Sequence, residues 1–360
     1  MVTRMIILRR LGRITVGALL LVHGATALGC ADPFAGGDDV ADDSSSGAED
    51  SASTGSAGDG DGDGDGDGDG DGDGDGDGDG DGDGDGDGDV NGALASGMFS
   101  ITQSWDQESD FDRPVFVDVP AGEGPHPVAI LLHGNGGNAT GMLNDIDYLP
   151  GHIRVAPQGY LNSWNLNYEA SKAPDVDFMR EVIAFLKTHS NVVDGDIAVL
   201  GNSNGSGLVN RLLIELEGDT FRHAVTIVSP LNDLQFRDGE FYYDPTGGNA
   251  YDTVTTPPAG RRLCNVSGTE DGIIPYSGGA GVAGYVFIAA EESTYIWAQH
   301  FGETGAAIDP SGGVPDAADP NVVEFAYLGG DVVHYKVQGA AHDAGGVASV
   351  RVKIAEFLSG

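Results

Sequence analysis

Short apolar runs alternate with helical patterns over residues 115–358, and this alternation limits the possible folds more than any other feature. The apolar runs occur at 115–119, 128–132, 153–156, 197–200, 224–229, 263–266 and 332–337. Helical patterns occur at 176–189, 208–216, 293–301 and 347–358. Continuous apolar strands that alternate with helices predict an α/β fold, in which helices cover both faces of a mostly parallel central sheet. Two stretches, 232–259 and 306–321, lack a period and are expected to be irregular surface segments.

The segment before this region has a composition that cannot build a core. Residues 31–89 contain no basic residue and one aromatic, Phe34, and Asp alternates with Gly from Asp59 to Asp89. Such a segment buries too little apolar surface to offset chain entropy, so residues 31–90 are expected to form a disordered acidic linker. The repeat resembles the start of a calcium loop but lacks the Glu at position 12. A solvated spacer is therefore the favoured interpretation, and weak binding of divalent cations by the repeat remains open.

Residues 1–30 have the pattern of an export signal. Four arginines precede an apolar stretch at 14–22, and small residues follow. The apolar stretch is too short for a lasting membrane span. Ala27-Leu28-Gly29-Cys30 resembles a bacterial lipobox, which predicts lipidation of Cys30, although plain secretion remains an alternative. The expected location is extracellular or in the cell envelope, periplasmic or on the outer surface.

Residues 91–360 are expected to form one domain, and their charge excludes several partners. This part holds 34 of the 57 acidic and 13 of the 17 basic residues, so its net charge is −21. Nucleic acids and anionic membranes need a basic face, so membrane contact is expected only through a lipid on Cys30. The other cysteine, Cys264, lies among apolar residues and is expected to be an inert buried thiol.

The pentapeptide Gly201-Asn202-Ser203-Asn204-Gly205 is the main candidate for chemistry. It directly follows the apolar run 197–200 and precedes the helical pattern 208–216. A G-x-S-x-G motif between a strand and a helix presents an exposed serine on a sharp turn, which predicts Ser203 as a nucleophile. In a chain with 59 glycines, the alternative is a turn with an ordinary solvated serine.

A second glycine-rich turn follows the run 128–132. The sequence His133-Gly134-Asn135-Gly136-Gly137-Asn138 would let a backbone N–H point toward a developing oxyanion. The expected donors are the backbone N–H groups of Asn135 and Asn204, and the His133 side chain is expected to support the loop. The alternative is a turn without chemistry.

A serine nucleophile needs a base and an acid that orients this base. Asp271 follows the run 263–266, and His342 follows the last run, 332–337. Both positions fit the order Ser, acid, His of α/β-hydrolases. Asp271 is preferred to its neighbour Glu270, because adjacent loop side chains usually point apart.

Taken together, these segments resemble the extracellular esterase family of polyhydroxybutyrate depolymerases and feruloyl or acetylxylan esterases, within the α/β-hydrolase superfamily. The resemblance covers about residues 112–360. Its other pieces are Arg113 with Pro120, Ala156-Pro157-Gln158-Gly159, Ser163-Trp164-Asn165, Asp175-Val176-Asp177-Phe178, Gly268-Thr269-Glu270-Asp271, Pro275 to Gly279, Trp297-Ala298 and Gly339 to His342. The resemblance implies Ser203 as nucleophile, Asp271 as acid and His342 as base, and it suggests that Trp164 lines a substrate pocket. A packed core position for Trp164 is the alternative.

The chain departs from the family at two places. Asn135 stands where the family often has a cysteine, and Asp343-Ala344 stand where it often has Trp-Pro. The second change puts the substrate in doubt.

The remaining polar residues are assigned other roles. His334 is expected to be packed or solvated and Asp343 to be solvated, while Asp175 and Asp177 are expected to stabilise a helix N-terminus. No cluster has zinc-site spacing, and no cofactor is expected.

The sequence thus predicts a secreted or surface-anchored serine ester hydrolase that acts on polyester, on feruloyl or acetyl polysaccharide, or on related acyl esters. Two alternatives remain: a serine peptidase of the same fold, and a non-catalytic surface lipoprotein with a cation-binding acidic tail.

Overall fold

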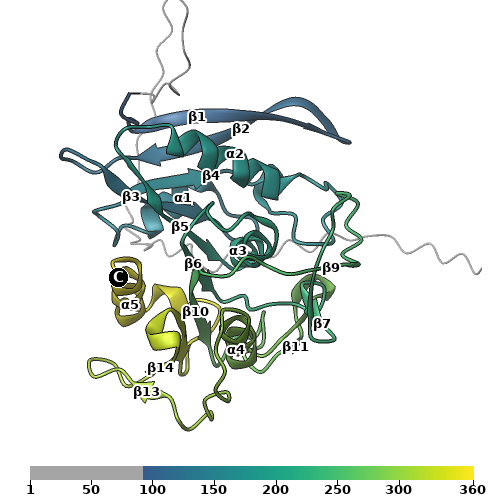
Figure 1. Ribbon diagram of the computed structural model, residues 1–360, viewed down its shortest axis with the longest axis vertical. Coiled ribbons are helices and arrows are strands. Elements are labelled where there is room, and N and C mark those ends of the chain that lie inside the picture. The colour runs from purple at the N-terminus through teal and green to yellow at the C-terminus, as the bar shows by residue number, and fades with distance from the viewer. Residues whose placement is uncertain (1–91) are drawn as a thin grey trace, which may run out of the picture. The chain divides into compact units, whose positions relative to one another are not determined.

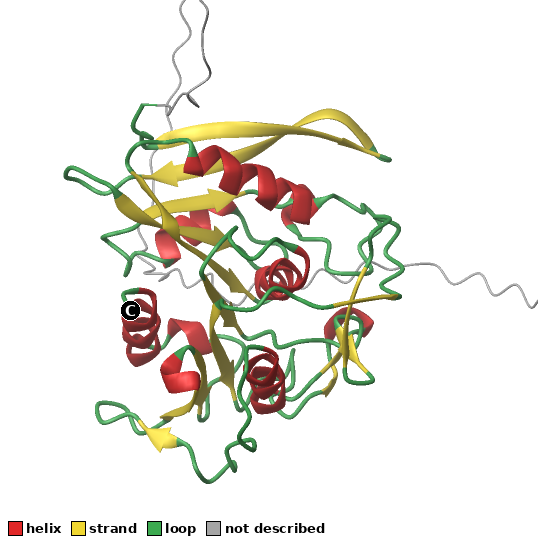
Figure 2. Ribbon diagram, in the orientation of Figure 1, coloured by secondary structure: helices red, strands yellow, loops and turns green. Residues whose placement is uncertain are grey.

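The computed structural model describes residues 92–360, which form a large sheet with helices on both faces (Figures 1 and 2). The export signal, the lipid site at Cys30 and the acidic linker predicted above lie outside these residues. The main sheet has ten strands in the order β1-β2-β4-β3-β5-β6-β10-β15-β14-β13.

Its strands are β1 (Gly97–Trp105), β2 (Glu108–Asp118), β3 (His126–Leu132), β4 (Ile153–Pro157), β5 (Val192–Asn202), β6 (His223–Ile227), β10 (Arg262–Gly268), β13 (Val314–Pro315), β14 (Val322–Tyr327) and β15 (Val332–Val337). The helices are α1 (Ala139–Asp145), α2 (Asp175–Lys187), α3 (Asn204–Glu215), α4 (Ala290–His300) and α5 (Ala348–Leu358).

The middle of the sheet is parallel, as the sequence predicts. Strands β4, β3, β5, β6, β10 and β15 run in one direction, while β1 and β2 at one edge and β14 and β13 at the other pair antiparallel. Each of the seven predicted apolar runs overlaps a strand of this sheet. The α/β fold class is therefore confirmed.

Alternate residues of the central strands pack into two cores. In β5, Ile197 and Val199 join the core that lies under α2, α3 and α4, whereas Ala198 and Leu200 join the core under α1 and α5. All four side chains are almost completely buried. A strand buried on both faces has no polar side to mark its period, which explains why it appears in the sequence as a continuous apolar run.

Strand β1 and helix α1 were not predicted from the sequence. Strand β1 lies at the edge of the sheet, where Phe99 and Ile101 are only partly buried against the core and the one fully buried residue, Gln103, is polar. Helix α1 has only seven residues and contains a glycine. Its start is fixed by Asn138, whose Oδ1 accepts a hydrogen bond from the Gly141 N–H at 2.8 Å.

The prediction for residues 232–259 is partly wrong, because this segment contains a small second sheet. Strands β7 (Phe236–Arg237), β8 (Glu240–Tyr243) and β9 (Thr253–Thr255) pair antiparallel. The buried ring of Phe241 packs on Trp297 of α4, with ring centroids 4.6 Å apart. Another short hairpin pairs β11 (Gly279–Ala280) with β12 (Val286–Phe287).

Within residues 92–360, no helix combines the length and apolar character needed to cross a membrane.

Candidate active site

Ser203 occupies the sharp turn that joins β5 to α3 (Figure 1). Its backbone has φ 52° and ψ −117°, a conformation that residues with side chains rarely adopt. A Cβ atom at Gly205 would lie 2.2 Å from the Leu132 carbonyl oxygen, and one at Gly201 would lie 2.4 Å from the Gly205 carbonyl carbon. Both flanking positions therefore accept only glycine, so the motif is a steric requirement of this turn.

The structure brings His342 and Asp271 together with Ser203. The Nε2 atom of His342 lies 2.8 Å from Ser203 Oγ, and its Nδ1 atom lies 2.7 Å from Asp271 Oδ2. The Asp271 side chain is 2 % exposed and the His342 side chain 18 % exposed. The Asp271 carboxylate accepts a hydrogen bond from the His342 Nδ1–H, which leaves Nε2 free to accept the hydroxyl proton of Ser203.

The strands β10 and β15 explain why these two distant residues meet. They are parallel neighbours, and Gly268 pairs with Val337, so the loops after both strands emerge side by side. A Cβ atom at Gly268 would lie 2.3 Å from the Ala340 carbonyl oxygen, so this glycine permits the close approach of the two loops.

Asp271 and its neighbour Glu270 point in different directions, as expected: Asp271 contacts His342, and Glu270 is exposed. The Oδ1 atom of Asp271 accepts hydrogen bonds from the N–H groups of Ile273 and Ile274, at 2.8 and 2.9 Å. These two bonds fix the plane of the carboxylate so that Oδ2 faces His342. Glu270 is exposed and contributes its backbone N–H to the Ala340 carbonyl at 2.9 Å.

The loop after β3 lies against the serine. A Cβ atom added to Gly134 would be 3.5 Å from the Cβ of Ser203. The backbone N–H groups of Asn135 and Asn204 find no hydrogen-bond acceptor within residues 92–360. The role of these two groups as oxyanion donors stays a prediction, for which their lack of an acceptor is a requirement.

The ring of His133 is used to hold this loop. Its Nε2 accepts the Gly159 N–H at 3.0 Å, so the Nδ1–H donates to the Gly134 carbonyl at 2.7 Å. Burial lowers the pKa of His133, which keeps the ring neutral in this arrangement.

Trp164 does not line a pocket, contrary to what the family resemblance suggests. Its side chain is completely buried, and its Nε1–H donates to the His133 carbonyl at 2.8 Å. A ring with no exposed surface cannot stack on a ligand, so the alternative of a packed core tryptophan is correct.

Asp175 and Asp177 lie in the first turn of α2, so their negative charges stand at a helix N-terminus as expected, although no side-chain hydrogen bond caps this helix. The carboxylate of Asp175 has a further role, because it forms a completely buried ion pair with Arg113 at 2.5 Å and accepts the Asn165 N–H. Sequence analysis missed this pair because the partners are 62 positions apart. Asp177 is exposed and pairs with Arg180.

His334 and Asp343, to which the sequence assigns no catalytic role, form no hydrogen bond with Ser203 in the described part of the chain. His334 is completely buried in β15, where Tyr276 and Asn265 are its hydrogen-bond partners. Asp343 is exposed. In the described part of the chain, no three His, Cys, Asp or Glu residues are grouped in a way that could hold a metal ion. Cys264 is buried, and burial raises the pKa of its thiol.

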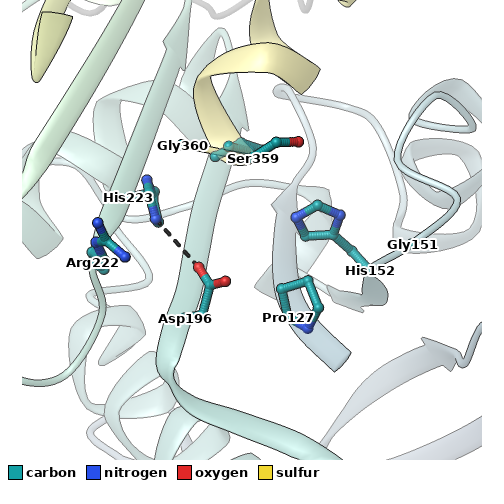
Figure 3. A pocket seen from close by; sticks show the side chains of 9 residues that line it. Pro127, Gly151, His152, Asp196, Arg222, His223, Ser359 and Gly360 are labelled. Carbon is teal, nitrogen blue, oxygen red and sulfur yellow. Dashed lines mark ion pairs between the residues drawn. The ribbon is translucent and has the colours of Figure 1, made fainter. Parts of the chain in front are cut away.

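A cavity of about 350 Å³ lies at the amino ends of the parallel strands, away from Ser203. Figure 3 shows the carboxylate of Asp196 between the rings of His152 and His223. The Nε2 atom of His223 lies 3.3 Å from Asp196 Oδ1 without the geometry of a hydrogen bond. This cavity lies at the end of the sheet opposite to the triad of Ser203, His342 and Asp271.

Comparison of the structure with solved structures gives the fold. No protein-family model and no curated protein matches the sequence. The chain is similar to an acetyl xylan esterase from Aspergillus awamori, with a TM-score of 0.51 and 13% identity over 73% of this chain and 99% of the other. It is also similar to LpqC, a poly(3-hydroxybutyrate) depolymerase from Bordetella parapertussis (TM-score 0.45, 16% identity, 73% and 89% covered). A third similar structure is a carboxylesterase from Bacillus cereus (TM-score 0.40, 14% identity, 69% and 93% covered).

The strand order, the helices on both faces and the likeness to the acetyl xylan esterase agree with one another. The chain therefore has an α/β-hydrolase fold.

Proposed function

We propose that this protein is a serine carboxylic ester hydrolase that works through an acyl-enzyme. The observation that carries the proposal is the continuous hydrogen-bonded chain from Ser203 Oγ through His342 to Asp271, with contacts of 2.8 and 2.7 Å. The free N–H groups of Asn204, in the β5–α3 turn, and of Asn135, in the loop after β3, would provide a place for negative charge. A nucleophile, a base and an oxyanion site together are the requirements of acyl transfer.

The first half of the reaction forms the acyl-enzyme. Ser203 Oγ attacks the ester carbonyl carbon while its proton passes to His342 Nε2. The carbonyl oxygen becomes an oxyanion that accepts hydrogen bonds from the two backbone N–H groups. His342 then gives the proton to the leaving alkoxide oxygen, the C–O bond breaks, and the alcohol departs.

The second half releases the acid. A water molecule attacks the acyl carbon, and His342 Nε2 takes its proton. The tetrahedral intermediate collapses, Ser203 Oγ leaves and recovers the proton, and the carboxylic acid is freed. Asp271 stabilises the charged imidazole in both halves and keeps its proton on Nδ1.

The substrate classes proposed are polyester, feruloyl or acetyl esters of polysaccharide, and related acyl esters. They come from the resemblance of the sequence motifs to extracellular esterases. The export signal in residues 1–30 and the lipobox-like Cys30 support a secreted or surface-anchored enzyme. The acidic linker would then hold the domain away from the surface, with weak binding of divalent cations as a further property of its repeat.

The test uses the full chain and its Ser203→Ala variant. A fluorophosphonate probe should label the wild type and leave the variant unlabelled, because only an activated serine reacts. A panel of p-nitrophenyl esters, methyl ferulate, acetylated xylan, polyhydroxybutyrate and peptide anilides then identifies the substrate class. Faster cleavage of anilides than of esters would favour the serine peptidase, and a wild type that neither reacts nor hydrolyses would leave the non-catalytic lipoprotein.

A further inference from the structure

The side chain of Asn204 forms two hydrogen bonds with the backbone of Trp164. Its Oδ1 accepts the Trp164 N–H at 2.8 Å, and its Nδ2 donates to the Trp164 carbonyl at 3.1 Å. The Ser163 hydroxyl adds a third contact to Oδ1 at 3.4 Å. Because both ends of the amide are engaged, its plane is fixed relative to the segment that contains Trp164.

The indole of Trp164 makes a second set of contacts, with His133. Its Nε1–H donates to the His133 carbonyl at 2.8 Å, and its ring lies on the His133 ring with centroids 5.0 Å apart. His133 is buried and leads directly into the loop of Gly134 and Asn135. Trp164 therefore touches the two segments that carry the free N–H groups, the β5–α3 turn and the loop after β3.

We propose that the Asn204 side chain and Trp164 are positioning residues that set the separation of the two oxyanion donors. The proposal rests on the proposed function, since it assigns these donors a role in acyl transfer. Neither side chain touches the ester. They act by holding the N–H of Asn204 and the N–H of Asn135 in a fixed relation, through one bridge that runs Asn204–Trp164–His133.

The chemistry makes this relation important. An oxyanion donor acts only when it lies about 2.7–3.1 Å from the developing charge. A misplacement of about 1 Å can cost a factor of ~100 in rate. The two donors lie on segments about 70 positions apart in sequence, so their separation depends on contacts between segments, and the bridge supplies such contacts.

The chain offers a matched control for the key substitution. Asn191 makes the same two-point contact with the backbone of Leu94, in which Oδ1 accepts the N–H at 2.7 Å and Nδ2 donates to the carbonyl at 3.0 Å. It lies just before β5, at the opposite end of the strand from Ser203. Asn191→Ala and Asn204→Ala therefore remove the same chemical contact at different distances from the triad.

For Asn204→Ala, we expect kcat on a p-nitrophenyl ester to fall about 10- to 100-fold with KM changed less than about two-fold, since the donors act on the transition state. The affinity for an aryl trifluoromethyl ketone, which forms a tetrahedral adduct with an oxyanion, should fall in proportion to kcat/KM. Asn191→Ala should leave both quantities within about two-fold of the wild type. Urea midpoints of both variants separate this effect from a loss of stability.

Trp164→Phe is the second variant, because it removes the indole N–H contact, together with part of the buried ring, and keeps the backbone groups that Asn204 binds. If the bridge acts as one unit, the effects of Trp164→Phe and Asn204→Ala on ketone affinity should be clearly less than additive. An Asn204→Ala variant that behaves like Asn191→Ala overturns the proposal, as does a fall in kcat without a matching fall in ketone affinity. A wild type that neither hydrolyses esters nor reacts with fluorophosphonate would remove the proposed function itself, which is a different result.

Discussion

The Asp271 carboxylate uses its two oxygens for different purposes. Oδ1 accepts two backbone N–H groups, and Oδ2 faces His342 Nδ1. The backbone donors thus decide which atom points at the imidazole. This arrangement predicts how the substitution Asp271→Asn, which replaces the carboxylate by an amide of the same shape, would affect ester hydrolysis.

In Asp271→Asn, the amide oxygen should stay with the two backbone donors, so its NH₂ group would face Nδ1. The imidazole would then carry its proton on Nε2 and could not accept the proton of Ser203. We expect kcat/KM for a p-nitrophenyl ester to fall by a factor on the order of 10⁴. The exposed neighbour gives the control: Glu270→Gln should stay within about two-fold, and equal losses in both variants would show that Asp271 is not the acid.

At the scale of elements, the β5–α3 junction depends on two glycines that pack against backbone. Gly205→Ala would place a methyl group 2.2 Å from the Leu132 carbonyl oxygen, so β3 and α3 would have to separate. We expect a loss of at least about 2 kcal/mol in the free energy of unfolding, together with most of the activity. Urea denaturation measures the first and ester hydrolysis the second.

Gly195→Ala in the same strand is the comparison, because a Cβ atom there meets nothing within 4 Å. It should change stability by less than about 1 kcal/mol. If both alanine variants unfold at the wild-type urea concentration, the steric account of the motif is wrong.

The buried ion pair of Arg113 and Asp175 joins β2 to the start of α2. Both side chains are fully buried, and the guanidinium also lies 3.8 Å from the centre of the Phe178 ring. Removal of one charge leaves the other buried without compensation. Asp175→Asn should therefore lower the free energy of unfolding by about 3–5 kcal/mol, as measured by urea denaturation.

Asp177→Asn provides the reference for this loss of stability, because Asp177 lies two residues after Asp175 in the same helix. Its carboxylate is 62 % exposed, so its pairing with Arg180 should contribute well under about 1 kcal/mol. Equal effects of the two substitutions would contradict a structural role of the buried pair.

Across the whole protein, two buried histidines are expected to make the free energy of unfolding depend on pH. Burial, with the positive charges of Arg262 and Arg222, lowers the pKa of His223 to about 4, although the Asp196 carboxylate acts in the opposite sense. Burial and Lys336 lower the pKa of His334 to about 3. An unfolded histidine has a pKa of about 6.5, so between these values the unfolded state binds more protons.

The contribution of these histidines is therefore complete above about pH 6.5 and is lost as the pH falls toward 4. The free energy of unfolding should fall between pH 7 and pH 4.5 by on the order of 1–3 kcal/mol more in the wild type than in His223→Gln. Urea titrations at several pH values measure the difference. Parallel curves for the two proteins would show that His223 does not carry this dependence.

Much of the site follows from the local sequence. Continuous apolar runs mark the parallel strands, and the carboxyl ends of neighbouring parallel strands meet at one edge, so polar residues just after each run were expected to meet. Ser203, Asp271 and His342 each follow such a run, and the structure places them in contact. The edge strand β1 was missed because the polar Gln103 interrupts the apolar face that Phe99 and Ile101 begin, and α1 was missed because seven residues are too few to display a helical period.

The fold class and the positions of Ser203, Asp271 and His342 could therefore be predicted from the sequence, because periodicity and strand ends are local properties of the chain. The burial of Trp164, the pairing of Asp175 with Arg113 and the contact of the Asn204 side chain with the Trp164 backbone could not be predicted in this way. These three outcomes depend on partners 40 or more positions away or on burial from every side. No local pattern records such a partner, since the contact exists only when the segments are packed together.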